Sequence, residues 1–142
     1  MFKDILLTVD LEHDSSWRRA LPIALAQAKT FGSRLHVLTV VPDYGLSMVG
    51  QYFPANYETK LKEETTKRLH DFVRDHVPED VAVQHCVGGG RIYDSILDFA
   101  ERLKVDLIVM AAHRPELRDY LLGPNAARVV RHAKCSVLVV RE

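Results

Sequence analysis

The residues with the clearest chemical meaning stand late in the chain, where a glycine precedes a helical pattern. Gly123 would let a ligand approach the backbone closely. Helix N-termini carry free N–H groups and a positive dipole, which favour phosphate. Pro124 suits the first helical position sterically but has no N–H to offer an anion. Gly123 and Pro124 therefore predict either a phosphate site or only a turn and a helix start.

A carboxylate at the end of the first apolar run is a candidate for sugar binding. Asp10 follows the run 5–9 directly. A carboxylate in this position would accept hydrogen bonds from ribose hydroxyls, as in other α/β nucleotide sites. It would equally well cap a local turn before Asp14, and the sequence leaves both roles open.

Glycines and cations stand at two further strand ends. The run Gly88–Gly90 predicts either a nest of N–H groups for an anion or a flexible turn. Arg91 follows these glycines, and His113 and Arg114 follow the apolar run 107–111. These three cations would lie near the 88–90 glycines. Alternatively, each is a solvated loop residue.

Sequence patterns of known catalysts are missing. There is no P-loop, no G-x-G-x-x-G after the first strand and no G-x-S-x-G elbow. The histidines do not stand in metal-ligand spacing, so neither catalytic residues nor a metal site are predicted. Cys86 and Cys135 form neither a CxxC nor a zinc pattern, and we expect both to be buried and reduced. Enzyme activity is therefore the less favoured interpretation.

The elements that must position these residues alternate between strands and helices. Apolar runs predict strands, and those at 5–9 and 107–111 read as buried on both faces. The predicted strands lie at 5–9, 35–41, 81–87, 107–111 and 137–140. Helical spacing predicts four helices between them. These helices cover about 17–28 after the caps at 14–16, 57–73, 92–103 and a short stretch from 124.

This alternation predicts an α/β fold with a doubly wound, five-stranded parallel sheet and helices on both faces. Gly32 is expected to end the first helix, and Pro22 to lie in its first turn or at a kink. The strand at 81–87 alternates weakly between apolar and polar residues, which is typical of an edge strand. Ligands of such sheets bind beyond the carboxyl ends of the strands, where the strand order reverses.

Composition and charge narrow the class of protein. The 142 residues suit one domain, covering 1–142, with 47% apolar and 27% charged residues. Lys plus Arg number 19 and Asp plus Glu number 19, so no global charge favours nucleic acid or an anionic membrane. No apolar run is long enough to span a bilayer and no signal peptide is indicated. We therefore expect a cytoplasmic protein without membrane insertion.

Taken together, these segments resemble the universal stress protein family over the whole chain. The resemblance rests on Val9-Asp10, Val40-Val41-Pro42, the 88–90 glycines, Ala111-Ala112-His113-Arg114, Leu121-Leu122-Gly123-Pro124-Asn125-Ala126 and the closing residues 129–141. It implies the strand order 3-2-1-4-5 and a homodimer in the cytosol. The last strand, which is apolar and lies at an edge in this order, is the expected dimer contact.

Nucleotide-binding members of this family carry Gly-x-x-Gly, nine further residues and then Gly-Ser or Gly-Thr. Here Ala111 and Arg114 stand at the first two glycine positions, only eight residues separate Arg114 from Gly123, and Pro124 replaces the Ser or Thr. The His-Arg-Pro and Leu-Leu-Gly-x-Asn-Ala segments look like a subgroup with its own version of this loop.

Position by position, the resemblance implies a complete nucleotide site. It puts adenine against Val40 and Val41 and ribose at Asp10, with Gly88 and Gly90 lining the same cleft. The implied phosphate-binding positions are Ala112, His113, Arg114, Gly123, Pro124 and Asn125.

Three functions are consistent with the sequence. The first is a stress-response module that binds ATP or AMP, forms a homodimer and acts on an unidentified protein partner. The second is a dimeric scaffold of the same fold that binds no nucleotide, because Pro124 stands in place of Ser or Thr. The third is a slow ATPase, although no acidic pair at fixed spacing predicts a Mg²⁺ site.

Overall fold

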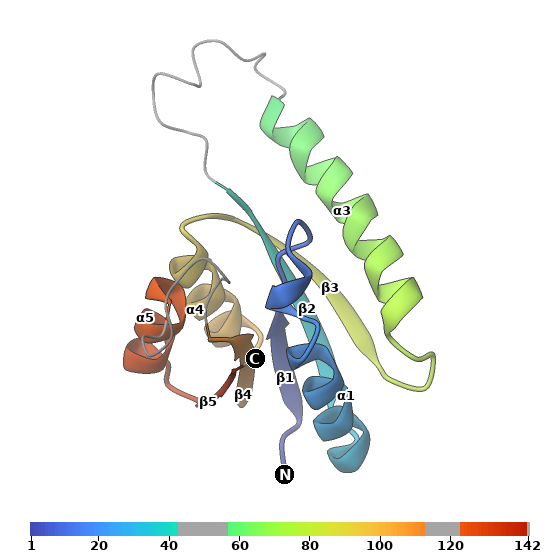
Figure 1. Cartoon of the computed structure of the whole chain (residues 1–142), viewed down its shortest axis with the longest axis vertical. Coiled ribbons are helices and arrows are strands. Elements are labelled where there is room, and N and C mark those ends of the chain that lie inside the picture. The colour runs from blue at the N-terminus through green and yellow to red at the C-terminus, as the bar shows by residue number, and fades with distance from the viewer. Residues whose placement is uncertain (43–56, 113–122, 142) are drawn as a thin grey trace.

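Five strands pair into one parallel sheet in the computed structural model, which describes residues 1–42, 57–112 and 123–141 (Figure 1). The strand order is β3-β2-β1-β4-β5, the order that the family resemblance implies. The strands are β1 Asp4–Thr8, β2 Arg34–Pro42, β3 Val83–Gly90, β4 Leu107–Ala111 and β5 Ser136–Val140. The two apolar runs expected at the centre are indeed neighbours, because Ile5 pairs with Leu107 on one side and with Leu35 on the other.

Helices cover both faces of this sheet. α1 (Ala20–Phe31) and α3 (Tyr57–His76) lie on one face, and α4 (Ile92–Arg102) and α5 (Pro124–His132) lie on the other (Figure 1). A short 3-10 turn, η1 (Asp14–Ser16), precedes α1. No helix in the described part of the chain is long and apolar enough to cross a membrane.

Successive residues of the central strands pack into two separate cores, one on each face of the sheet, because side chains alternate between the faces. Leu7 of β1 packs under α1 and α3, whereas Leu6 packs under α4 and α5. Both side chains are fully buried, and burying a side chain of this size stabilises the fold by about 1.5–3 kcal/mol. The central strands must therefore be apolar on both faces, which is why their sequences read as continuous runs.

The first helix begins later than the caps suggest. Residues 14–16 form the 3-10 turn, and α1 starts only at Ala20, after Arg19, whose side chain makes no capping hydrogen bond. The reason is that the hydroxyl of Ser16 binds the backbone of the preceding loop instead of capping the helix. Pro22 falls in the first turn of α1, and Gly32 ends the helix with φ 63°, a left-handed conformation suited to glycine.

The three consecutive glycines also differ from the expected turn. Gly88 and Gly89 continue β3 opposite Val40 and Val41 of β2, and Gly90 is the last strand residue. Only Gly90 has a positive φ, 82°, and it turns the chain toward α4. β3 thus begins two residues later and ends three residues later than the predicted strand at 81–87. Its end was missed because glycine carries no side chain to show burial.

The edge strand β3 is held to α3 by a pair of stacked imidazoles. The rings of His70 and His85 lie 3.8 Å apart between centroids, with planes inclined by 16°. Burial, together with the neighbouring His70, lowers the pKa of His85. The lowered pKa favours the neutral form of His85 in this contact.

Candidate functional site

A cavity of about 670 Å³ opens at the carboxyl ends of β1, β2 and β4. This volume falls within the range of sites for small molecules and cofactors. Its walls are the loop after β1, the ends of β2 and β4, the N-terminal half of α3, and the first turns of α4 and α5. The cavity thus lies where the strand order reverses on either side of β1, as predicted for a doubly wound sheet.

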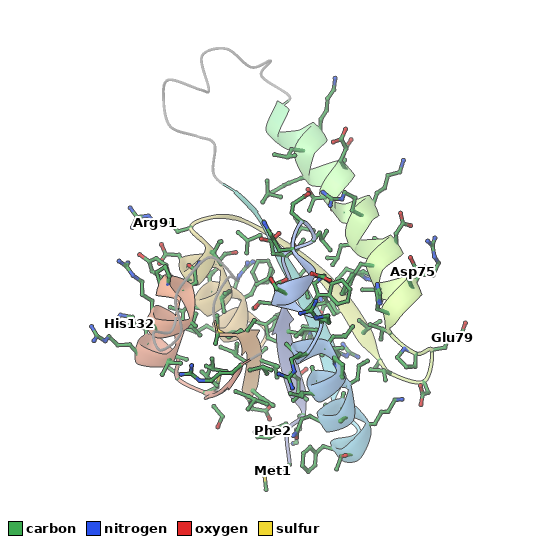
Figure 2. All side chains as sticks on the ribbon, viewed as in Figure 1. Met1, Phe2, Asp75, Glu79, Arg91 and His132 are labelled. Carbon is green, nitrogen blue, oxygen red and sulfur yellow. The ribbon has the colours of Figure 1, made fainter. Side chains whose placement is uncertain are left out.

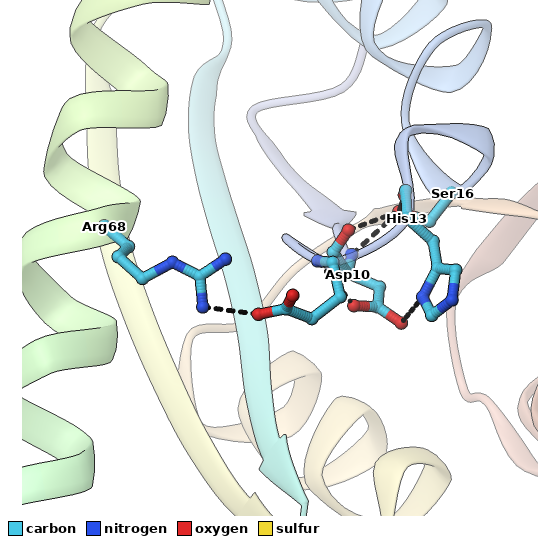
Figure 3. A network of polar contacts seen from close by, with 5 residues as sticks. Asp10, His13, Ser16 and Arg68 are labelled. Atoms are coloured by element: carbon cyan, nitrogen blue, oxygen red, sulfur yellow. Dashed lines mark hydrogen bonds and ion pairs between the residues drawn. The ribbon is translucent and has the colours of Figure 1, made fainter.

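The loop after β1 is folded around Asp10 (Figure 3). One carboxylate oxygen of Asp10 accepts a hydrogen bond from the Glu12 N–H at 2.9 Å, and the other lies 3.0 Å from Nδ1 of His13. The Asp10 N–H donates to Oγ of Ser16 at 2.8 Å, and the Ser16 hydroxyl donates to the His13 carbonyl at 2.7 Å. Asp10 therefore does organise a local turn, one of the two roles that the sequence leaves open.

This turn is compatible with the second role, ribose binding. A carboxylate offers about four lone-pair positions, so a group that orients its own loop can still accept from a ligand hydroxyl. Asp10 lines the cavity together with Glu12 and His13. The turn holds the carboxylate in place at the mouth of the cleft before any ligand arrives.

Helix α3 contributes residues that the sequence interpretation missed. Leu61, Thr65 and Arg68 line the cavity from the side of α3. Nη1 of Arg68 forms an ion pair with Oε1 of Glu12 across the cleft, as Figure 3 shows. Both side chains are exposed, so this pair stabilises the fold by at most about 1 kcal/mol. The helical spacing in the sequence distinguishes the polar face of α3 from the face that packs on the core. It does not show that some residues of α3 line a cavity, and for this reason they were missed.

The N-terminus of α5 is tied to the end of β4 through the backbone. The Gly123 N–H donates to the Ala112 carbonyl at 2.7 Å, and the Ala112 N–H donates to the Val140 carbonyl at 2.9 Å. Both N–H groups are therefore already used within the fold. Since Pro124 has no N–H, the first-turn N–H groups that remain for a ligand are those of Asn125 and Ala126.

Most of the predicted site residues come together in this cavity. Seven of the eleven positions line it, namely Asp10, Val40, Val41, Ala112, Gly123, Pro124 and Asn125. His113 and Arg114 lie outside the described residues. Gly88 and Gly90 are not among the residues that line the cavity, although β3 runs beside β2 there. Their proposed part in binding remains a prediction.

Metal-ligand clusters and reactive thiols are two features that bear on the chemistry open to the site. Among the described residues, no group of three or more His, Cys, Asp or Glu side chains could hold a metal ion. Burial raises the pKa of the Cys86 thiol to about 11, and burial also raises the pKa of Cys135. Both cysteines are unpaired and are protonated at neutral pH, which makes them poor nucleophiles. As predicted, Cys86 is buried, whereas Cys135 is only partly so.

Fold and cleft together define a doubly wound α/β protein with a ligand cleft at its switch point. The family model described as Universal stress protein family matches residues 1–141, and the chain belongs to this family. It is 31% identical over 144 residues to Universal stress protein G of Escherichia coli O157:H7, covering 99% of this chain and 100% of that protein.

Two solved structures of similar fold contain nucleotides. A universal stress protein in complex with cAMP has a TM-score of 0.63 and 23% identity, covering 99% of this chain and 97% of that one. A universal stress protein family member from Arabidopsis thaliana with AMP bound has a TM-score of 0.65 and 18% identity, covering 99% and 91% of the two chains. At these identities the likeness shows the fold.

Proposed function

We propose that this stress protein binds an adenine nucleotide, ATP or AMP, in the cavity at the carboxyl ends of β1, β2 and β4. The observation that carries the proposal is the convergence of three different groups on one cavity. The strand-end residues Val40 and Val41 supply an apolar wall, Asp10 supplies a carboxylate, and the first turn of α5 supplies N–H groups. These are the chemistries that a base, a sugar and a phosphate require.

The orientation of the ligand follows from these three groups. The base would lie against Val40 and Val41 at the end of β2, and the ribose hydroxyls would donate to Asp10. The phosphates would then point toward Asn125 at the start of α5, where the helix dipole is positive. The two similar structures that contain cAMP and AMP support an adenine nucleotide as the ligand.

A regulatory role fits this site better than catalysis. The described part of the cavity brings together no metal-binding cluster, and ATP hydrolysis needs a metal and a group that positions water. We expect turnover well below the rate of about 1 per second that is common for enzymes. We further propose a cytoplasmic homodimer that pairs through β5 and signals its nucleotide state to a protein partner.

One observation favours a second candidate, a scaffold of the same fold that binds no nucleotide. At the start of α5, where the phosphates would lie, three residues have no backbone N–H available for an anion. Pro124 has no N–H, and the N–H groups of Gly123 and Ala112 donate within the fold. A nucleotide would depend more on its base and sugar contacts than on this helix end.

The test is to identify what the purified protein carries and what it takes up. Mass spectrometry of the denatured protein should detect AMP or ATP, and calorimetry should detect binding of added nucleotide. Asp10→Ala should weaken binding by about tenfold, since hydrogen bonds to a charged group contribute about 1.5–3 kcal/mol. The matched control is Asp14→Ala, an exposed carboxylate in the adjacent turn that does not line the cavity. A protein that releases no nucleotide and binds none would be the scaffold instead.

A further inference from the structure

Two arginines beside the cleft converge on one tyrosine. Nη1 of Arg128, on α5, donates to Oη of Tyr93 at 2.7 Å, and Nη1 of Arg91 donates to the same oxygen at 3.3 Å. The guanidinium carbon of Arg128 also lies 4.6 Å from the centre of the Tyr93 ring, within range of a cation–π contact. One phenol oxygen thus holds two positive charges close to one another.

Arg74 on α3 and Arg102 on α4 each pair with a carboxylate on their own helix, whereas Arg91 and Arg128 meet on a phenol oxygen. Arg74 pairs with Asp71 at 3.1 Å, and Arg102 pairs with Asp98 at 3.0 Å. Among the described residues, no carboxylate lies within ion-pair distance of Arg91 or Arg128. The hydrogen bond to Tyr93, and to a smaller extent the charge of Asp94, raises the pKa of Arg91. Two guanidinium groups held together without an anion repel each other, so an anion between them would be stabilised.

Arg91, Tyr93 and Arg128 do not line the cavity themselves, but they adjoin residues of α4 and α5 that do. Arg128 is three residues after Asn125 on α5, so the two side chains share a face of the helix, and Asn125 lines the cavity. Helical side chains lean toward the N-terminus, which brings Arg128 back toward this rim. Ile92, between Arg91 and Tyr93, also lines the cavity. Figure 2 shows Arg91 at the end of α4 that lies toward the carboxyl ends of the strands.

We propose that Arg91 and Arg128, oriented by Tyr93, bind the outer phosphates of the nucleotide and so select a nucleoside triphosphate over a monophosphate. The inference rests on the proposed function, because it concerns the same cleft. The first phosphate would lie at the start of α5, and each further phosphate would extend toward the two guanidinium groups. Arginine suits this task because its planar fork binds two phosphate oxygens at once.

The experiment compares adenosine, AMP and ATP by calorimetry on the wild type and on three variants. The wild type should bind ATP more tightly than AMP. Arg91→Gln and Arg128→Gln should each weaken ATP by about threefold to fivefold, the range of an exposed ion pair, and the double variant by about tenfold or more. AMP and adenosine should be bound as by the wild type, and added salt should reduce the ATP advantage.

Three further variants separate a specific role from a change in net charge or structure. Arg131→Gln removes an equivalent charge in the last turn of α5, three residues beyond Arg128, and should leave the ratio of ATP to AMP affinity unchanged. Tyr93→Phe keeps both charges but removes the oxygen that orients them, so it should lower that ratio less than the double variant. Arg128→Lys should recover part of the ratio, because it restores a charge without the fork.

The outcomes distinguish failure of this inference from failure of the proposed function. If the wild type binds AMP and ATP but the double variant keeps the wild-type affinity ratio, the inference is overturned and the nucleotide site stands. Equal weakening of AMP and ATP would also overturn it, since the arginines would then act on the site as a whole. If inorganic triphosphate binds as tightly as ATP, the cluster is a separate anion site and the inference is wrong. If the wild type binds no nucleotide, both proposals fall.

Discussion

At the scale of single residues, Pro124 is favourable for the start of a helix but unfavourable for phosphate binding. Proline is favourable at the first position of a helix, because its φ is already helical and the N–H there has no partner within the helix. A phosphate bound at this helix N-terminus would accept a hydrogen bond from the N–H that proline lacks. With Gly123 bonded to Ala112, the helix end is left with two first-turn donors in Asn125 and Ala126.

Pro124→Ser should therefore tighten ATP binding by about tenfold or more. A serine adds an N–H and a hydroxyl, and hydrogen bonds to charged groups contribute about 1.5–3 kcal/mol each, with 1.4 kcal/mol corresponding to tenfold. Adenosine, which has no phosphate, should be bound nearly as before. Calorimetry with both ligands measures the difference.

Pro124→Ala is the matched control for this prediction, because it restores the N–H without a hydroxyl. It should give an intermediate affinity for ATP. If Pro124→Ser changes nothing although the wild type binds ATP tightly, the phosphates are held away from the start of α5, and Arg91 becomes a stronger candidate for holding them.

At the scale of secondary structure elements, the packing of α4 on β3 depends on the absence of a side chain at Gly88. A Cβ at this position would lie 2.0 Å from Oγ of Ser95 and 3.1 Å from a ring carbon of Phe99, both on α4. Ser95 is itself buried, so little room is available for it to move. The close packing of α4 thus explains why position 88 is a glycine, without reference to any ligand.

Gly88→Ala should destabilise the protein by about 1–3 kcal/mol, the usual cost of overpacking a filled interior. Adding Ser95→Ala removes the oxygen at 2.0 Å and should restore part of the lost stability. Gly89→Ala is the control, since a Cβ there meets nothing within 4 Å, and its effect should be small. Urea unfolding measures all three variants. If Gly88→Ala were as stable as Gly89→Ala, the close approach of α4 to β3 would be wrong.

At the scale of the whole molecule, the sheet has an apolar open edge at β5. The Ala112 N–H donates to the Val140 carbonyl, so the backbone of Val140 faces β4. Alternation along the strand then turns the N–H and C=O groups of Val139 toward the open edge. The side chains of residues 137–139 are only partly buried in the single chain. An exposed strand of this composition favours pairing with another strand, and two copies would be related by a two-fold axis.

We expect a homodimer that Val139→Lys converts to a monomer, because a lysine at a sheet edge opposes strand pairing. Light scattering at micromolar concentration gives the mass, and circular dichroism checks that the variant is folded. Gln84→Lys on β3, the opposite edge of the sheet, should leave the dimer intact. A wild type that is monomeric, or a folded Val139→Lys dimer, would show that β5 is not the interface.

The sequence patterns by themselves determined the order of the elements and a doubly wound parallel sheet, and the family resemblance supplied the full strand order. Burial on two faces demands continuous apolar runs, and this requirement is visible locally in β1 and β4. Gly32 likewise marks the end of α1 because the left-handed conformation there suits glycine. With helices between parallel strands, the position of the cleft at the strand ends follows from topology, and Asp10 and Asn125 could be assigned to it in advance.

Only the tertiary structure decided which side chains and backbone groups meet around the cleft. Arg68 reaches Glu12 across 56 positions of the chain, and Tyr93 meets Arg128 across 35, so no local pattern reveals either contact. The bond between Gly123 and Ala112 removes an N–H that the sequence offers to a phosphate. In the sequence, Gly88 was interpreted as part of an anion-binding turn. A glycine can be needed because the backbone must adopt an unusual conformation or because there is no room for a side chain, and the sequence does not show which. That distinction depends on Ser95, which a different element brings against it.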